Sequence, residues 1–128
     1  MQQVDLQSLL AAVDVPADWI GIREVTETHS PRIVRDGVPE VNGRFTTQGL
    51  MVEVLAGGQF GYYGTPNMTD VGISDAAKKA YAQAKRAANH ATYKFTDAAR
   101  PANVGSYQSP FVKEMDTISP GELNKILL

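Results

Sequence analysis

The sequence predicts an α+β fold in which one long helix covers an antiparallel sheet. Segments rich in β-branched and aromatic residues occupy the region before residue 65, an alanine-rich segment with helical periodicity follows at 70–92, and a short helical pattern lies near the N-terminus. The 128 residues, 43% of them hydrophobic, are enough for a single modest core. We therefore expect a two-layer sandwich, in which a long Ala-rich helix covers an antiparallel β-meander and a short helix precedes it.

The N-terminal region predicts a short helix and then a strand. Leu6, Leu9, Leu10 and Val13 recur at helical spacing, and Pro16 follows, which indicates one amphipathic helix within residues 4–13. Residues 19–28 are β-branched and aromatic, with alternating polar residues in their second half, which is typical of a strand.

Two hairpins are predicted next. Residues 32–35 form a short strand that ends at Asp36-Gly37, a pair suited to the positive φ values of a two-residue turn. Pro39 cannot donate to a ladder, so the return segment is an edge strand or a loop. The second hairpin spans residues 46–65, with its turn at Gly57-Gly58. In its first strand Leu50, Val52 and Val54 share one face, and Met51, Glu53 and Leu55 share the other.

A long helix is predicted from about Asp70 to about Thr92, with Thr69 as its N-cap. Its small apolar residues form one stripe that would allow close approach to a sheet, namely Ile73, Ala77, Ala80, Tyr81, Ala84, Ala88 and Ala91. Periodicity is lost after Phe95, and Pro101, Gly105 and Pro110 interrupt an extended stretch.

The last ten residues have the features of a helix start. Ser119, Pro120 and Glu122 form a capping box, and Leu123, Ile126 and Leu127 then fall on one face. So short a helix needs a surface to dock on. We expect residues 1–118 to form the α+β domain and residues 119–128 to be the start of a further, truncated segment.

Composition and charge disfavour several classes of partner. The net charge of −2 gives no long-range attraction for nucleic acid. We interpret Lys78, Lys79, Lys85 and Arg86 as the solvated face of the long helix rather than as a nucleic-acid surface. No apolar run is long enough for a signal core or a membrane span, and cysteine is absent. These features predict a soluble, cytoplasmic protein without membrane or nucleic-acid partners.

The residue inventory offers no catalytic or metal-binding set. The two histidines, His29 and His90, have no metal-ligand motif beside them, and no strained-serine motif is present. The glycines at 57–64 are followed by a strand rather than a helix, which favours a turn over a phosphate loop. We therefore expect no catalytic, metal or cofactor-binding residues. Phe60, Tyr62, Tyr63 and Tyr81 are expected to be mainly core, and Tyr63, on the opposite face from Tyr62, to be the one that contacts a partner.

From Trp19 onward the sequence resembles the amino-terminal domain of the TldD/PmbA family. The resemblance is carried by "GIREVTETHSPRIVRDGVPE", by "TTQGLMVEVLAGGQFGYYGT", by the threonine-capped alanine-rich helix after it, and by the extended segment that leads to a new helix at Ser119. Members of this family were once labelled modulators of DNA gyrase and are now regarded as zinc-dependent peptidases that mature or degrade peptides.

The resemblance implies a peptidase context for a chain that lacks the family's metal motif. The family's zinc-binding HExxxH motif lies on a later helix and has no counterpart here, so zinc is expected only in a full-length member. We expect a non-catalytic domain that is inactive alone, helps a homo- or heterodimer of such subunits to assemble, and walls a channel for a peptide substrate. Leu123, Ile126 and Leu127 would then be partner contacts. The alternative is a stand-alone protein- or peptide-binding adaptor that has lost the catalytic part.

Overall fold

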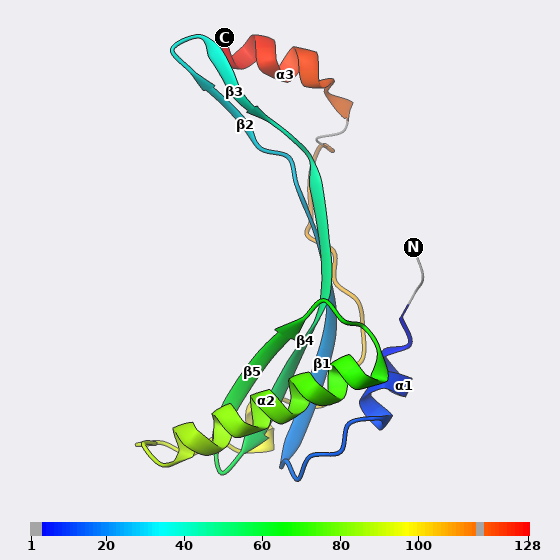
Figure 1. Cartoon of the computed structure of the whole chain (residues 1–128), viewed down its shortest axis with the longest axis vertical. Coiled ribbons are helices and arrows are strands. Elements are labelled where there is room, and N and C mark those ends of the chain that lie inside the picture. The colour runs from blue at the N-terminus through cyan, green and yellow to red at the C-terminus, as the bar shows by residue number, and fades with distance from the viewer. Residues whose placement is uncertain (1–3, 115–116) are drawn as a thin grey trace. The chain divides into compact units, whose positions relative to one another are not determined.

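The computed structural model describes residues 4–114 and 117–128 and has an α+β architecture, as the sequence predicts (Figure 1). In chain order the elements are α1 (Leu6–Ala11), β1 (Trp19–His29), β2 (Arg32–Arg35), β3 (Val38–Asn42), β4 (Phe45–Ala56), β5 (Gln59–Thr65), α2 (Asp70–Ala88), the short 3₁₀ helix η1 (Asp97–Ala99) and α3 (Pro120–Leu127).

The chain divides into two compact units, which are described separately. The first unit takes in Met1–Thr26 and Gln48–Ala102, and the second takes in Glu27–Thr47 and Asn103–Leu128. The expected division at residue 118 stays a prediction. Because β1 and β4 are long, each contributes residues to both units.

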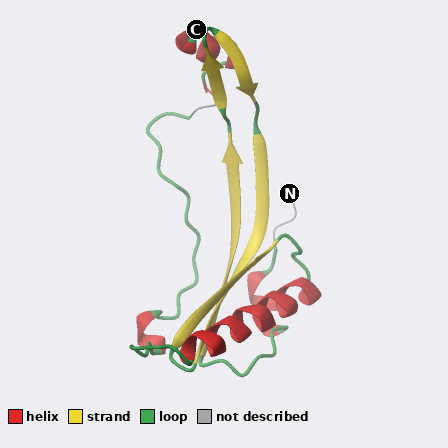
Figure 2. Ribbon diagram, turned by 60° about the vertical axis from the view of Figure 1, so that its left-hand side comes forward, coloured by secondary structure: helices red, strands yellow, loops and turns green. Residues whose placement is uncertain are grey.

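The first unit contains a three-stranded sheet with the order β1-β4-β5 and the helix α2 lying across one face of it (Figures 1 and 2). β4 and β5 are antiparallel and joined at Gly57-Gly58, whose φ values of 63° and 77° suit a two-residue hairpin turn. The position of the turn agrees with the prediction. The sheet is not a simple meander, because β1 pairs with β4, whereas β2 and β3 pair with each other.

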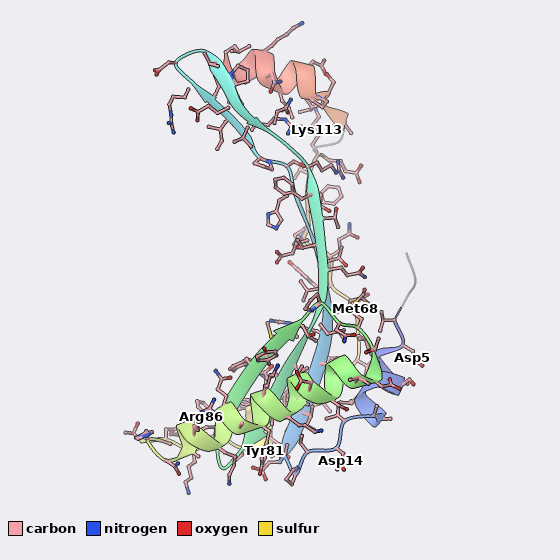
Figure 3. All side chains as sticks on the ribbon, in the orientation of Figure 1. Asp5, Asp14, Met68, Tyr81, Arg86 and Lys113 are labelled. Atoms are coloured by element: carbon pink, nitrogen blue, oxygen red, sulfur yellow. The ribbon has the colours of Figure 1, made fainter. Side chains whose placement is uncertain are left out.

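The core of the first unit lies between β4 and α2. Leu50, Val52 and Val54 share one face of β4, as alternation predicted, and on that face they are buried against a stripe of α2. The buried residues of that stripe are Gly72, Ile73, Ala76, Ala77, Ala80 and Ala84. The contact is close because β5 has a glycine at position 61, where a Cβ atom would lie 2.8 Å from the Ala84 nitrogen. Tyr81, labelled in Figure 3, packs at the border of this core.

The helix starts were predicted better than the helix ends. The Thr69 hydroxyl accepts a hydrogen bond from the Gly72 amide, so Thr69 is the N-cap of α2, as expected. The helix ends at Ala88 rather than near Thr92, because Asn89 is the C-cap and Ala91 lies beyond the last turn. α1 is also shorter than residues 4–13, because the Asp5 carboxylate caps its first turn through the Gln7 and Ser8 amides.

The second unit contains the β2–β3 hairpin and α3. Asp36 and Gly37 have φ values of 50° and 73°, which confirms the predicted turn. Pro39 lies in β3 opposite Val34, in a two-stranded sheet whose strands are both edges, as a proline in a strand requires. α3 contacts β2.

Candidate functional surfaces

Tyr63 lies on the side of β5 that faces α2. It is paired with Val52, and its side chain is 39% exposed. The Lys79 ammonium lies 4.8 Å from the centre of the Tyr63 ring and donates a hydrogen bond to the Tyr63 hydroxyl at 3.3 Å. Lys79 also pairs with Asp75 at 2.7 Å, and the hydrogen bonds to Asp75 and then to Tyr63 raise the pKa of Lys79. Tyr63 is therefore a partly exposed ring held by a lysine of α2.

The opposite face of the sheet carries a cluster of aromatic rings, which we call the Phe60 cluster. The Phe60 ring lies 6.3 Å from the ring of Trp19, 6.3 Å from that of Tyr62 and 5.5 Å from that of Phe95. Tyr93 packs edge-on against Phe95 at 5.0 Å. These rings come from β1, β5 and the segment after α2, so residues far apart in the sequence meet on this face.

An ion pair borders the Phe60 cluster. The Arg100 guanidinium lies 5.3 Å from the centre of the Phe60 ring, and its Nε donates to a Glu53 carboxylate oxygen at 3.0 Å. Partial burial, followed by the negative charge of Glu53, raises the pKa of Tyr62. The Phe60 cluster was missed in the sequence because only Phe60 and Tyr62 share a local pattern. The sequence did indicate part of the cluster: period-two spacing puts Phe60 and Tyr62 on one face of β5, opposite Leu55 and Glu53 of β4.

The three residues expected on the last helix share α3. The predicted capping box is present: the Glu122 amide donates to the Ser119 hydroxyl, and the Ser119 amide donates to the Glu122 carboxylate. No described residue of α3 is buried; Leu123 is half-buried, Ile126 is 75% exposed and Leu127 is 48% exposed. These residues belong to the second unit and Tyr63 to the first, so the predicted contacts are spread over both units.

Other apolar side chains of the second unit are exposed as well. They are Ile33, Val38, Phe45, Val104, Tyr107, Phe111, Val112 and Leu128. Single exposed apolar side chains are ordinary on any protein, so these residues by themselves do not mark a partner surface.

The described residues provide no site for the zinc of a metallopeptidase. In the described ranges, 4–114 and 117–128, no three His, Cys, Asp or Glu side chains gather in a way that could hold a metal ion. The ring of His29 pairs with Glu27 at 3.2 Å in the second unit, whereas His90 lies in the first unit, just after α2. The donor set does not fit zinc, because a catalytic zinc needs three protein ligands that converge.

Comparison with models of known protein families shows the family to which this chain belongs. The family model described as PmbA/TldA metallopeptidase domain 1 matches residues 22–88, which is more than half of the chain. The chain belongs to this family. Searches among curated proteins and among solved structures found no match.

The match to PmbA/TldA metallopeptidase domain 1 confirms the resemblance drawn from the sequence. It runs from β1 to the end of α2, so it includes Tyr63 and most of the first unit but not α3. Among the described residues, no helix is both long enough and apolar enough to cross a membrane.

Proposed function

We propose that this chain is the non-catalytic N-terminal domain of a TldD/PmbA-like metallopeptidase, and that it contributes to subunit assembly and to the wall of the substrate channel. The observation that carries the proposal is the combination of the family match at residues 22–88 with the exposed apolar face of α3. A domain of a metallopeptidase family without a convergent donor set among its described residues is suited to a scaffold role.

The assembly role is supported by the chemistry of the α3 face. Ile126 and Leu127 expose large aliphatic side chains on a helix that has no buried residue of its own. A helix of eight residues gains most of its stability from docking, so a face of this kind favours a second subunit as its cover. The partner would be another TldD/PmbA-like subunit, identical or related, without nucleic acid or membrane.

The catalytic parts of the proposal concern the full-length protein. Zinc and the peptide substrate would both be bound by sequence outside this chain, and the family's label as a gyrase modulator would reflect peptide processing rather than DNA binding. A cytoplasmic location is part of the proposal, and the absence of cysteine is compatible with it.

Sedimentation equilibrium tests the assembly role. The wild-type chain is expected to dimerise, and Ile126→Glu is expected to weaken the dimer because a charge would replace a buried aliphatic contact. Lys125→Glu is the matched control and should leave the dimer intact, because helical spacing puts this exposed residue on the side of α3 opposite Ile126 and Leu127. A wild-type chain that is monomeric at high concentration would refute the assembly role.

Tyr63 favours the second candidate, a protein- or peptide-binding adaptor. Its ring contacts Lys79 and remains 39% exposed, and partly exposed aromatic residues are common anchors at interfaces. A monomeric chain that binds an unfolded peptide, and loses the binding in Tyr63→Ala but not in Tyr107→Ala, would favour the adaptor. Tyr107 is the control because it is exposed and lies in the other unit.

A further inference from the structure

β5 is an edge strand, and the turn before it determines which of its backbone N–H and C=O groups point away from the sheet. The two-residue turn at Gly57-Gly58 makes Ala56 and Gln59 a hydrogen-bonded pair. Alternation along the register then directs the backbone groups of Gly61, Tyr63 and Thr65 toward β4. The backbone groups of Phe60, Tyr62 and Gly64 therefore point away from β4, toward the open side of the sheet.

The sequence of β5 lacks the usual protections of an edge strand. Gln59–Thr65 contains no charged residue and no proline, and its pairing with β4 runs without a bulge. Its aromatic residues favour extended structure, and two copies aligned antiparallel would bring no like charges together. The β5 strand of a second copy of this chain is therefore well suited to pair with this edge.

A side chain of α2 occupies the centre of that edge. The side-chain oxygen Oε1 of Gln83 accepts a hydrogen bond of 2.6 Å from the Tyr62 amide. Gln83 is held there because α2 packs closely on the sheet where Gly61 faces Ala80. At the start of β5 the Phe95 amide donates to the Gly58 carbonyl at 2.9 Å, so that end of the hairpin is also partnered.

We propose that Gln83 closes the β5 edge against antiparallel addition of β5 from a second copy of this chain. An added strand would need the Tyr62 amide, which sits at the middle of the outward row, and it would have to displace Gln83 first. A symmetric pair would displace two Gln83 side chains, so removing both hydrogen bonds should strengthen pairing by about tenfold or more. The inference is independent of the proposed α3 interface and implies that normal assembly does not use β5.

The test compares Gln83→Leu with Gln108→Leu. Both change glutamine to leucine, but Gln108 is exposed and lies outside helices and strands. Gln83→Leu is expected to associate about tenfold more tightly than the wild type and Gln108→Leu in sedimentation equilibrium. Hydrogen exchange should show the Phe60 and Gly64 amides gaining protection as the concentration of Gln83→Leu rises.

Two further results bear on the inference. Gln83→Glu replaces the amide oxygen by a carboxylate oxygen, which can still accept the hydrogen bond from the Tyr62 amide, and should associate no more tightly than the wild type. In dilute Gln83→Leu the Tyr62 amide should exchange faster than in the wild type, while far-UV circular dichroism stays unchanged because Gln83 is exposed. The proposal is overturned if Gln83→Leu associates no more tightly than Gln108→Leu, or if its tighter association leaves the Phe60 and Gly64 amides unprotected.

Discussion

Replacing Gly61 by alanine tests the close packing of α2 on the sheet. An added Cβ atom at this position would clash with the Ala80 carbonyl oxygen, and it would lie 2.8 Å from the Ala84 nitrogen and 2.9 Å from the Ala80 carbonyl carbon. All three are backbone atoms, so no side-chain rotation can relieve the contact. α2 would have to move away from β5, and the buried contacts of Ile73, Ala77 and Ala80 would loosen.

We expect Gly61→Ala to lower the free energy of unfolding by about 3 kcal/mol, at the upper end of the usual overpacking cost because the clash is with backbone. Gly64→Ala is the matched control in the same strand. Its Cβ atom would have Met51 Cε at 3.7 Å as its nearest neighbour, which is ordinary contact. Gly64 does not have a positive φ, so alanine there should change stability by no more than about 1 kcal/mol.

Urea unfolding followed by Trp19 fluorescence measures both variants. Trp19 is the only tryptophan and packs edge-on against Phe60, next to the substituted position, so it reports on the first unit. The two variants should differ by about 2–3 kcal/mol, and with a slope of about 1.5 kcal/mol per molar urea their midpoints should differ by about 1.3–2 M. Equal midpoints for Gly61→Ala and Gly64→Ala would refute the close helix–sheet contact.

Three other predictions concern the first turns of α2 and α3. Hydrogen bonds from the Ser119 hydroxyl and amide lower the pKa of Glu122 below its ordinary 4.5, so the charged carboxylate stabilises the start of α3. This stabilisation is fully present above pH 4.5, and it is lost as the pH falls through the lowered pKa of Glu122 in the folded protein. The Ser119 amide resonance should follow this titration in NMR, and should not do so in Glu122→Gln. Ile73→Ala should cost about 3 kcal/mol in thermal or urea unfolding because Ile73 is fully buried, whereas Val71→Ala, at a side chain that is 76% exposed, should cost less than about 0.5 kcal/mol. Thr69→Ala should cost about 1 kcal/mol through loss of the N-cap, and an unchanged unfolding midpoint would contradict the capping role.

Local patterns in the sequence predicted the local structure. The glycine pair at 57–58 determined the turn and therefore the register of β4 against β5. Period-two alternation placed Leu50, Val52 and Val54 on one face, and that face is buried in the structure. The capping residues Thr69 and Ser119 marked helix starts because a cap is a local hydrogen bond.

These local patterns could not predict which strands pair when they lie far apart in the sequence. Nothing local indicates that β1 pairs with β4 while β2 and β3 form a separate sheet. The Phe60 cluster was missed for the same reason, since Phe95 and Arg100 follow α2 in a segment without periodicity and meet β5 only in the folded chain. Ala88 and Ala91 were expected in the stripe, but Ala88 is only half-buried at the last position of α2 and Ala91 lies beyond the helix, whereas Ala76 is buried.

The most direct test of the proposed non-catalytic role is zinc binding and peptide cleavage by the purified chain. With two histidines and no cysteine in the sequence, we expect equilibrium dialysis to retain far less than one zinc per chain, and we expect no cleavage of an unfolded peptide. Retention of one zinc per chain together with cleavage that a chelator abolishes would contradict the proposal.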